Sequence, residues 1–210
     1  RELRKTWLQL NKTVRLKRYL IAFFVLNMGI QTVMYLAANF AKQEVKELSG
    51  DSRVVPISDA SLITSILIIQ LVAIAGALAF VQLSKRFGNV RALMIGACIW
   101  IGACLFAFTI TWATEFYALA VLVGLIMGGS QALSRSTYAK FLPETKDTAS
   151  FFSFYDVSYY MGTVLGTAAY GTVYAVTGDL RLTIVAIGSF FVLGLILLLR
   201  VPKEEVLVAA

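Results

Sequence analysis

The chain has 210 residues, of which 59% are hydrophobic and 15% are charged, and its formal net charge is +7. Soluble domains have roughly 45–50% apolar and about 25% charged residues, so this composition excludes an ordinary soluble domain and favours a membrane protein. The chain contains no histidine, which excludes a histidine metal ligand, a Ser–His or Cys–His dyad and a histidine pH switch.

Residues 1–18 form a basic segment in which Leu3, Trp7, Leu10 and Val14 alternate with cations. This spacing is typical of an amphipathic helix on a membrane surface, and equally of a linker helix between domains. The segment starts with Arg1 and has no signal-peptide pattern, so we expect the chain to be part of a longer protein. The predicted domains are a cytoplasmic linker (1–18), a six-helix transmembrane domain (19–200) and a cytoplasmic tail (201–210).

Six apolar runs follow in chain order, each long enough to form a helix that crosses a bilayer, which takes about 20 residues. None shows the strict alternation of barrel strands. The predicted fold is therefore an all-α membrane protein with six transmembrane helices. The segment 39–59 between the first two runs is interpreted as a helix extension and a turn. The runs cover approximately residues 19–38, 60–83, 92–112, 116–138, 151–176 and 182–199.

Positive charge is distributed unequally between the two sides of this bundle. Fifteen of the 19 lysine and arginine residues lie on the side of the two termini, and four lie on the other side: Lys42, Lys46, Arg53 and Arg181. Cytoplasmic loops carry the excess of Lys and Arg, so we expect both termini in the cytoplasm. Anionic lipid headgroups account for the net charge, and no nucleic-acid partner is expected.

The first apolar run carries Asn27, Gln31 and Tyr35, which are spaced four residues apart and therefore share one helix face. Polar groups in hydrocarbon usually face the bundle interior or a water-filled cavity. This polar stripe is interpreted either as the lining of a cavity or as hydrogen bonding between helices. Gln70, near the middle of the second run, has the same two interpretations.

The fourth and fifth runs carry further candidates. Gly124 and Gly128 are spaced for close helix packing, and Gln131 and Arg135 are again four residues apart. Arg135 either extends to the headgroups or forms a gate or ion pair, with Asp156 of the fifth run as its expected partner. Without that partner, Asp156 is a candidate proton carrier.

The loop after the second run resembles the short basic loop motif G-x-L-A-D-R-x-G-R-R of the major facilitator superfamily. Leu83, Arg86 and Gly88 match the motif, and Arg91 ends the loop. The sequence departs from the motif where the motif has its first glycine, its aspartate and its first basic residue after the second glycine: Val81, Lys85 and Asn89.

A second set of residues is similar to the vacuole effluxer-like branch of that superfamily, which includes yeast vacuolar amino-acid effluxers. The similarity lies in residues 128–136, Pro143, residues 151–158 and the stretch Asn27-x-Gly29-x-Gln31-Thr32, and it covers essentially the whole chain. The resemblance implies one half of a twelve-helix transporter, built from two inverted three-helix repeats. It also implies that this is the C-terminal half, with Asn27, Gln31 and Tyr35 facing the solute and Gln131, Arg135 and Asp156 nearer the cytoplasmic gate.

The function we expect is therefore secondary transport of a small solute, with amino acids as one candidate class, by alternating access. The expected partners are the lipid bilayer, the N-terminal half, the solute and, for an isolated half, a second copy. The expected location is a bacterial inner membrane. A non-transporting six-helix scaffold or receptor is the alternative, whereas an enzyme, a metal or a cofactor is not expected. Cys98 and Cys104 are interpreted as packing residues, and there is no P-loop string for ATP.

Overall fold

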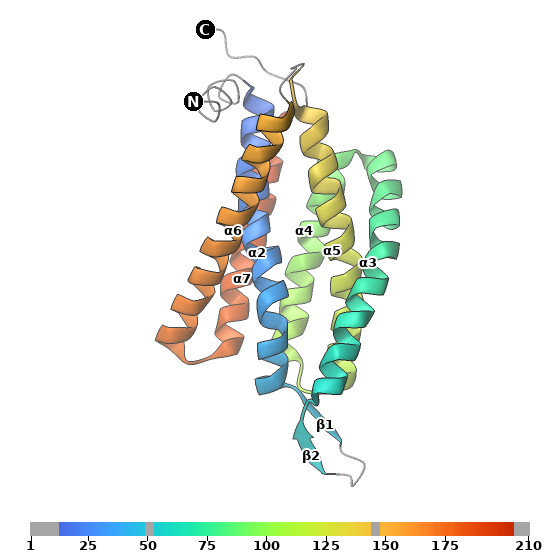
Figure 1. The fold of residues 1–210 in the computed structure, drawn as a ribbon, viewed down its shortest axis with the longest axis vertical. Coiled ribbons are helices and arrows are strands. Elements are labelled where there is room, and N and C mark those ends of the chain that lie inside the picture. Colours follow the sequence, from blue (N-terminus) through green and yellow to red (C-terminus); the bar gives the residue numbers. More distant parts are fainter. Residues whose placement is uncertain (1–12, 49–52, 144–147, 204–210) are drawn as a thin grey trace.

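The computed structural model describes residues 13–48, 53–143 and 148–203, which form a bundle of long helices with a short β-hairpin at one end (Figure 1). The hairpin pairs β1 (Lys46–Leu48) with β2 (Val54–Pro56) in antiparallel register. The predicted all-α membrane fold is thus confirmed, with the hairpin as an addition. The helices are α2 (Val14–Glu44), α3 (Asp59–Phe87), α4 (Asn89–Thr109), α5 (Ala113–Phe141), α6 (Thr148–Thr177) and α7 (Leu180–Leu199).

Within the described residues, five helices are long and apolar enough to cross a membrane, namely α2, α3, α4, α5 and α7. The helix α6 is not among them, although its 30 residues make it as long as its neighbours. Its tyrosine, serine, threonine and glycine residues lower its hydropathy. The six predicted runs therefore all form helices, and the assignment of α6 as a sixth span stays a prediction.

The helices form two triplets, α2–α3–α4 and α5–α6–α7, which run in opposite directions. Every close packing contact of one triplet has a counterpart in the other. The helix α3 packs on α5 as α6 packs on α2, and α4 packs on α5 as α7 packs on α2. The pairs α2–α5 and α4–α7 complete the pattern. Such an arrangement is what two inverted three-helix repeats related by a pseudo-two-fold axis produce.

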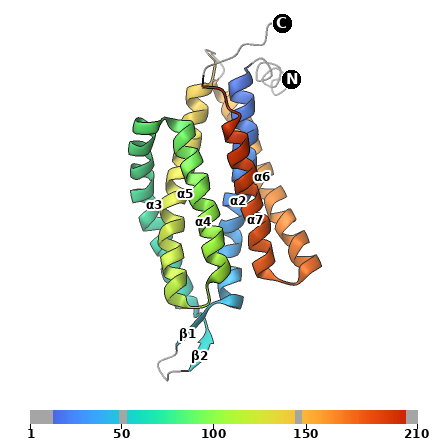
Figure 2. The ribbon, with the colours of Figure 1, turned by 180° about the vertical axis from the view of Figure 1, so that it is seen from behind.

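The two faces of the bundle consequently differ in their helices. One face presents α6, α2, α5 and α3 (Figure 1), and the opposite face presents α4 and α7 side by side (Figure 2). The start of α2, the end of α7, the α3–α4 turn and the end of α5 lie at one end, and the hairpin lies at the other. We call these the termini end and the hairpin end.

Glycines allow the helix backbones to approach closely at two symmetry-related interfaces. A Cβ atom added to Gly128 of α5 would lie 2.1 Å from the Ala73 carbonyl oxygen of α3, and one added to Gly76 would lie 2.1 Å from the Leu125 oxygen. At the α6–α2 interface, a Cβ on Gly166 would lie 2.5 Å from the Met28 oxygen. The backbones approach so closely only because these residues lack a side chain. The predicted close packing at Gly128 is confirmed.

The segment 39–59 differs from the prediction. The expected extension of the first helix to Glu44 is present, but a hairpin follows it. Its strands of three residues are too short to show an alternating pattern in the sequence. Glu47 of β1 accepts hydrogen bonds from the Ser61 hydroxyl at 2.6 Å and the Ser58 amide at 3.1 Å. The bonds from Ser61 and Ser58 hold the pKa of Glu47 below its ordinary value, and they tie the hairpin to the start of α3.

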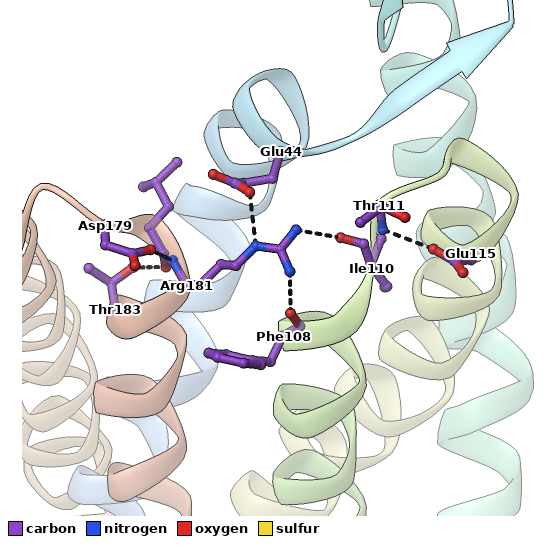
Figure 3. Close-up of polar contacts among 9 residues, drawn as sticks. Glu44, Phe108, Ile110, Thr111, Glu115, Asp179, Arg181 and Thr183 are labelled. Atoms are coloured by element: carbon purple, nitrogen blue, oxygen red, sulfur yellow. Dashed lines mark hydrogen bonds and ion pairs between the residues drawn. The ribbon is translucent and has the colours of Figure 1, made fainter. Parts of the chain in front are cut away.

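Arg181 joins three helices at the hairpin end (Figure 3). Its Nε donates to the Glu44 carboxylate of α2 at 2.9 Å. Its Nη1 donates to the Phe108 carbonyl at 2.6 Å and its Nη2 to the Ile110 carbonyl at 3.1 Å, at the end of α4. Asp179 caps α7 by accepting from the Arg181 amide at 2.7 Å. The guanidinium group therefore fixes α2, α4 and α7 relative to one another.

We expect Arg181→Gln to lower the free energy of unfolding by about 2 kcal/mol, because it removes three charge-assisted hydrogen bonds from a side chain only 27% exposed. Lys42→Gln is the matched control, since the Lys42–Asp59 pair at 2.8 Å is 56% and 78% exposed. Exposed pairs contribute about 0–1 kcal/mol. Thermal unfolding of both variants in detergent measures the difference, and equal losses would contradict the role given to Arg181.

The helix α2 begins at Val14, so the last residues of the predicted linker 1–18 are the first turns of a membrane helix. Residues 1–12 lie outside the described residues, and the amphipathic helix expected there stays a prediction. Of the predicted tail 201–210, the structure describes residues 201–203.

Candidate functional site

A polar pocket of about 480 Å³ lies between α2, α5 and α6, which together belong to the face shown in Figure 1. The helices α2 and α5 begin the two repeats, so the pocket lies where the pseudo-two-fold axis relates them. We call it the central pocket. Its lining residues are Phe23, Asn27 and Ile30 of α2, Gln131, Ala132, Ser134 and Arg135 of α5, and Tyr155, Asp156, Tyr159 and Tyr160 of α6.

The polar stripe of α2 lies partly in this pocket. Asn27 is 2% exposed and lines it, and its Nδ2 donates to the Tyr159 carbonyl of α6 at 2.7 Å. Gln31, 5% exposed, donates from Nε2 to Asn27 Oδ1 at 3.3 Å, but it is not among the lining residues. Tyr35 is 65% exposed and lies beyond the pocket. The stripe thus combines both interpretations offered by the sequence, because Asn27 lines the pocket and also bonds α2 to α6.

The two other predicted glutamines are in different places. Gln131 is exposed and lines the central pocket from α5, and it makes no hydrogen bond within the described part of the chain. Its amide is therefore available to a solute. Gln70 is exposed on α3 and does not line the pocket. Both glutamines were predicted to be possible cavity-lining residues, and the structure brings only Gln131 to the site.

Arg135 and Asp156 approach each other across the central pocket, with 3.7 Å between Nη2 and Oδ1. The predicted ion pair is thus present in the structure. The side chains are 61% and 48% exposed, so the pair contributes about 0–1 kcal/mol to stability. The Arg135 guanidinium also lies 5.7 Å from the ring centre of Phe152 and 5.9 Å from that of Tyr155. A weak, exposed pair of opposite charges can separate at little cost when another charged group enters.

An aromatic layer separates the central pocket from the termini end. The rings of Phe23 and Tyr155 stack at 4.4 Å, and Tyr155 packs on Tyr138 at 4.9 Å. Tyr138 donates its hydroxyl to the Phe151 carbonyl at 2.7 Å. Tyr19 donates to the Ser134 carbonyl at 2.7 Å. These bonds join α2, α5 and α6, and the layer is a barrier on one side of the pocket.

The aromatic layer was not among the functional residues predicted from the sequence. Buried tyrosines need a hydrogen-bond partner, and Tyr19 and Tyr138 are both fully buried. Their position within apolar runs was the only sequence signal that these tyrosines are buried. The carbonyl groups that accept their hydrogen bonds belong to other helices, so these bonds could not be predicted from the sequence of one helix.

The basic loop motif lies at the termini end. Gly88 has φ +87°, a conformation that favours glycine, and it ends α3 by donating its amide to the Ser84 carbonyl at 2.9 Å. Leu83 is partly buried against the core, whereas Arg86 and Arg91 are exposed. Asn89, at a position where the sequence departs from the motif, donates to the Thr137 hydroxyl of α5 at 3.0 Å. Asn89 thus links the loop to α5, which the motif comparison did not indicate.

The described residues include no group of three or more His, Cys, Asp or Glu that could hold a metal ion. Cys104 is buried and Cys98 is exposed. The central pocket offers amide, phenol and hydroxyl groups beside one pair of opposite charges.

Comparisons with known proteins agree in one family. The model of a family described as vacuole effluxer Atg22 like matches residues 1–210. An uncharacterized MFS-type transporter of Bacillus subtilis, YxiO, is 26% identical over 186 residues, which are 89% of this chain and 41% of the relative. Autophagy-related protein 22 of Vanderwaltozyma polyspora is 27% identical over 195 residues, covering 88% and 34%. The chain thus spans between about a third and two fifths of the length of these relatives.

Proposed function

The chain belongs to the vacuole effluxer Atg22-like family, and from this premise we propose that it forms the C-terminal half of a secondary active transporter. The half works by alternating access together with an N-terminal half that completes the solute pathway. Its six helices in two inverted triplets, and the 34–41% of its relatives' length that it spans, support a half rather than a whole.

The observation that carries this proposal is the position of the central pocket. It lies between the first helices of the two repeats and is lined by α2, α5 and α6, which belong to the face of Figure 1, with no described residue of α4 or α7 in its lining. Transporters of this architecture bind solute between halves, near the membrane midplane. The face of α6, α2, α5 and α3 is accordingly the one that meets the N-terminal half, and α4 and α7 face lipid.

The solute we propose is small and carries both charges, as an amino acid does. Arg135 offers a cation for a carboxylate, and Asp156 offers an anion for an ammonium group, with 3.7 Å between them. Gln131 offers a free amide, and Tyr160, which is 67% exposed, offers a phenol. In this proposal the Arg135–Asp156 pair and the aromatic layer close the pocket toward the termini end until a solute separates the pair.

We further propose that the termini end is cytoplasmic and that the membrane is a bacterial inner membrane. The cations of the described residues support this orientation, because Arg15, Arg91, Lys140 and Lys203 gather at the termini end. Separated from its N-terminal half, the chain would leave the central pocket open to lipid, where unpaired polar groups are costly. Pairing with a second copy through that face is therefore the expected behaviour of the isolated half.

The direct test is transport by the full-length protein in proteoliposomes, offered a mixture of amino acids, with Gln131→Ala as the variant. We expect about five-fold slower transport, because one solute hydrogen bond is worth about 1 kcal/mol. Unfolding temperature should stay unchanged, since Gln131 makes no hydrogen bond within the described residues.

Gln43→Ala is the matched control, since among the described residues this exposed glutamine forms a hydrogen bond only with Asn39, at the hairpin end of α2. Normal transport in both variants would contradict the assignment of the pocket. Absence of any transport by the folded full-length protein would favour the alternative, a six-helix scaffold or receptor module.

A further inference from the structure

A second cavity, of about 630 Å³, opens at the termini end, on the side of the bundle away from the central pocket. It lies where α2 and α4 begin and where α5 and α7 end. Among the residues that the structure describes, its lining includes four cations, Arg15, Arg91, Lys140 and Lys203, and no carboxylate. We call it the basic pocket. The excess of positive charge in this described lining attracts an anion.

The donors of the basic pocket are held in place but incompletely used. The Arg15 guanidinium lies 4.0 Å from the ring centre of Phe141, and its Nε is buried without a partner among the described residues. Lys140 donates to Asn89 Oδ1 at 3.2 Å, which positions its ammonium group beside the start of α4. The first turn of α4 has no side-chain cap and no acidic residue. Its free amides and positive dipole end add to the attraction for an anion.

An apolar groove continues from this pocket between α4 and α7, the two helices that lie side by side in Figure 2. The groove encloses about 710 Å³ between α4 and α7, and Ile95, Cys98, Ile99 and Leu195 line it. It shares Phe87, Arg91, Met94 and Leu199 with the basic pocket, so the two are continuous. A further apolar hollow of about 500 Å³ lies along the same two helices toward the hairpin end. A cationic pocket thus leads directly into a lipid-facing groove.

We propose that these two features together form a binding site for one anionic phospholipid. The phosphodiester group lies in the basic pocket, and an acyl chain lies in the groove between α4 and α7. Basic pockets between membrane helices on the cytoplasmic side bind such headgroups. A soluble phosphate would use the pocket but not the groove. A zwitterionic headgroup would bring an ammonium group to a pocket whose described lining has no carboxylate to receive it.

Native mass spectrometry of the intact protein in detergent, titrated with phosphatidylglycerol, tests the site. We expect Arg91→Gln with Lys140→Gln to weaken binding by about 25-fold, because each basic residue beside an anionic lipid contributes about five-fold. Lys85→Gln with Arg86→Gln is the control of equal charge, since both residues are at the same end but do not line the pocket. This control should change binding by less than about two-fold. Equal weakening by the two double variants would overturn the proposal, because it would mean general attraction to positive charge.

Two further ligands distinguish the sources of the phosphate. Phosphatidylcholine should bind wild type at least ten-fold more weakly than phosphatidylglycerol, and glycerol phosphate, which lacks acyl chains, should not compete at equal concentration. Effective competition by glycerol phosphate would assign the pocket to a soluble anion and overturn the lipid assignment. Equal binding of phosphatidylcholine would show that the cations play no part, and would equally overturn it.

Discussion

Replacing Gly128 with valine is expected to be among the most destabilising single changes in this chain, at about 3 kcal/mol or more. A Cβ atom at this position would lie 2.1 Å from the Ala73 carbonyl oxygen and 2.7 Å from its carbon. Both atoms belong to the backbone of α3, so no side chain can rotate away. The helices α3 and α5 must separate, and they share one of the closest interfaces in the bundle. Overpacking of a tight contact costs about 1–3 kcal/mol, and more where the backbone is blocked.

Gly102→Val is the matched control. Gly102 lies inside α4, and a Cβ atom there would meet nothing within 4 Å. Valine has a better helix propensity than glycine, so this variant should be as stable as the wild type or slightly more stable. Thermal unfolding of the two purified variants gives the comparison. If Gly128→Val unfolded at the temperature of Gly102→Val, the close approach of α3 and α5 would not describe the protein.

The sequence predicted the helices because each one carries its own signal. An apolar run of about 20 residues is sufficient to indicate a span, and Gly124 and Gly128 indicated close packing by their spacing alone. The hairpin at residues 46–56 had no such signal, because three-residue strands show no alternation. The helix α6 shows the opposite problem. Tyr155, Tyr159 and Tyr160 lower its hydropathy and line the central pocket, and Gly162 and Gly166 lie close against α2.

The candidate site was predictable where the evidence lay within one helix, and in one pair of opposite charges on neighbouring helices. Asn27 and Gln31 share a face because they are four residues apart, and they are hydrogen-bonded to each other. The same periodicity could not say what that face meets, so it could not separate Asn27, in the pocket, from exposed Tyr35. The ion pair of Arg135 with Asp156 was inferred from the need of each charge for a partner, and the two residues do meet.

Apart from the Arg135–Asp156 pair, the contacts described between different helices were not predictable from the sequence. Arg181 binds groups at positions 44, 108 and 110, which come from separate parts of the chain. Two of its acceptors are backbone carbonyls, which any residue provides, so no sequence pattern could mark them. The aromatic layer between the central pocket and the termini end was unpredictable for the same reason, because its buried hydroxyls donate hydrogen bonds to the backbone carbonyls of Ser134 and Phe151.

The measurement that most directly tests the central claim is the reactivity of single cysteines with a water-soluble maleimide. The claim is that the central pocket is filled with water and forms part of the solute pathway, whereas α4 and α7 face lipid. Ala132→Cys places a thiol in the pocket, and Ser189→Cys places one on the lipid face of α7. Both positions are exposed and both substitutions are small, and the positions lie nine and ten residues from the helix ends Phe141 and Leu199. Cys98 and Cys104, the only cysteines of the chain, are first replaced by alanine.

The full-length protein in lipid nanodiscs is labelled from both sides, so the orientation does not affect the result. We predict that Ala132→Cys reacts at least a hundred-fold faster than Ser189→Cys, because maleimide reacts with thiolate in water and the thiolate does not form in hydrocarbon. After unfolding in a strong detergent, both should react equally, which confirms that both thiols are intact. Equal rates in the native protein, or a Ser189→Cys that reacts faster than Ala132→Cys, would contradict the account.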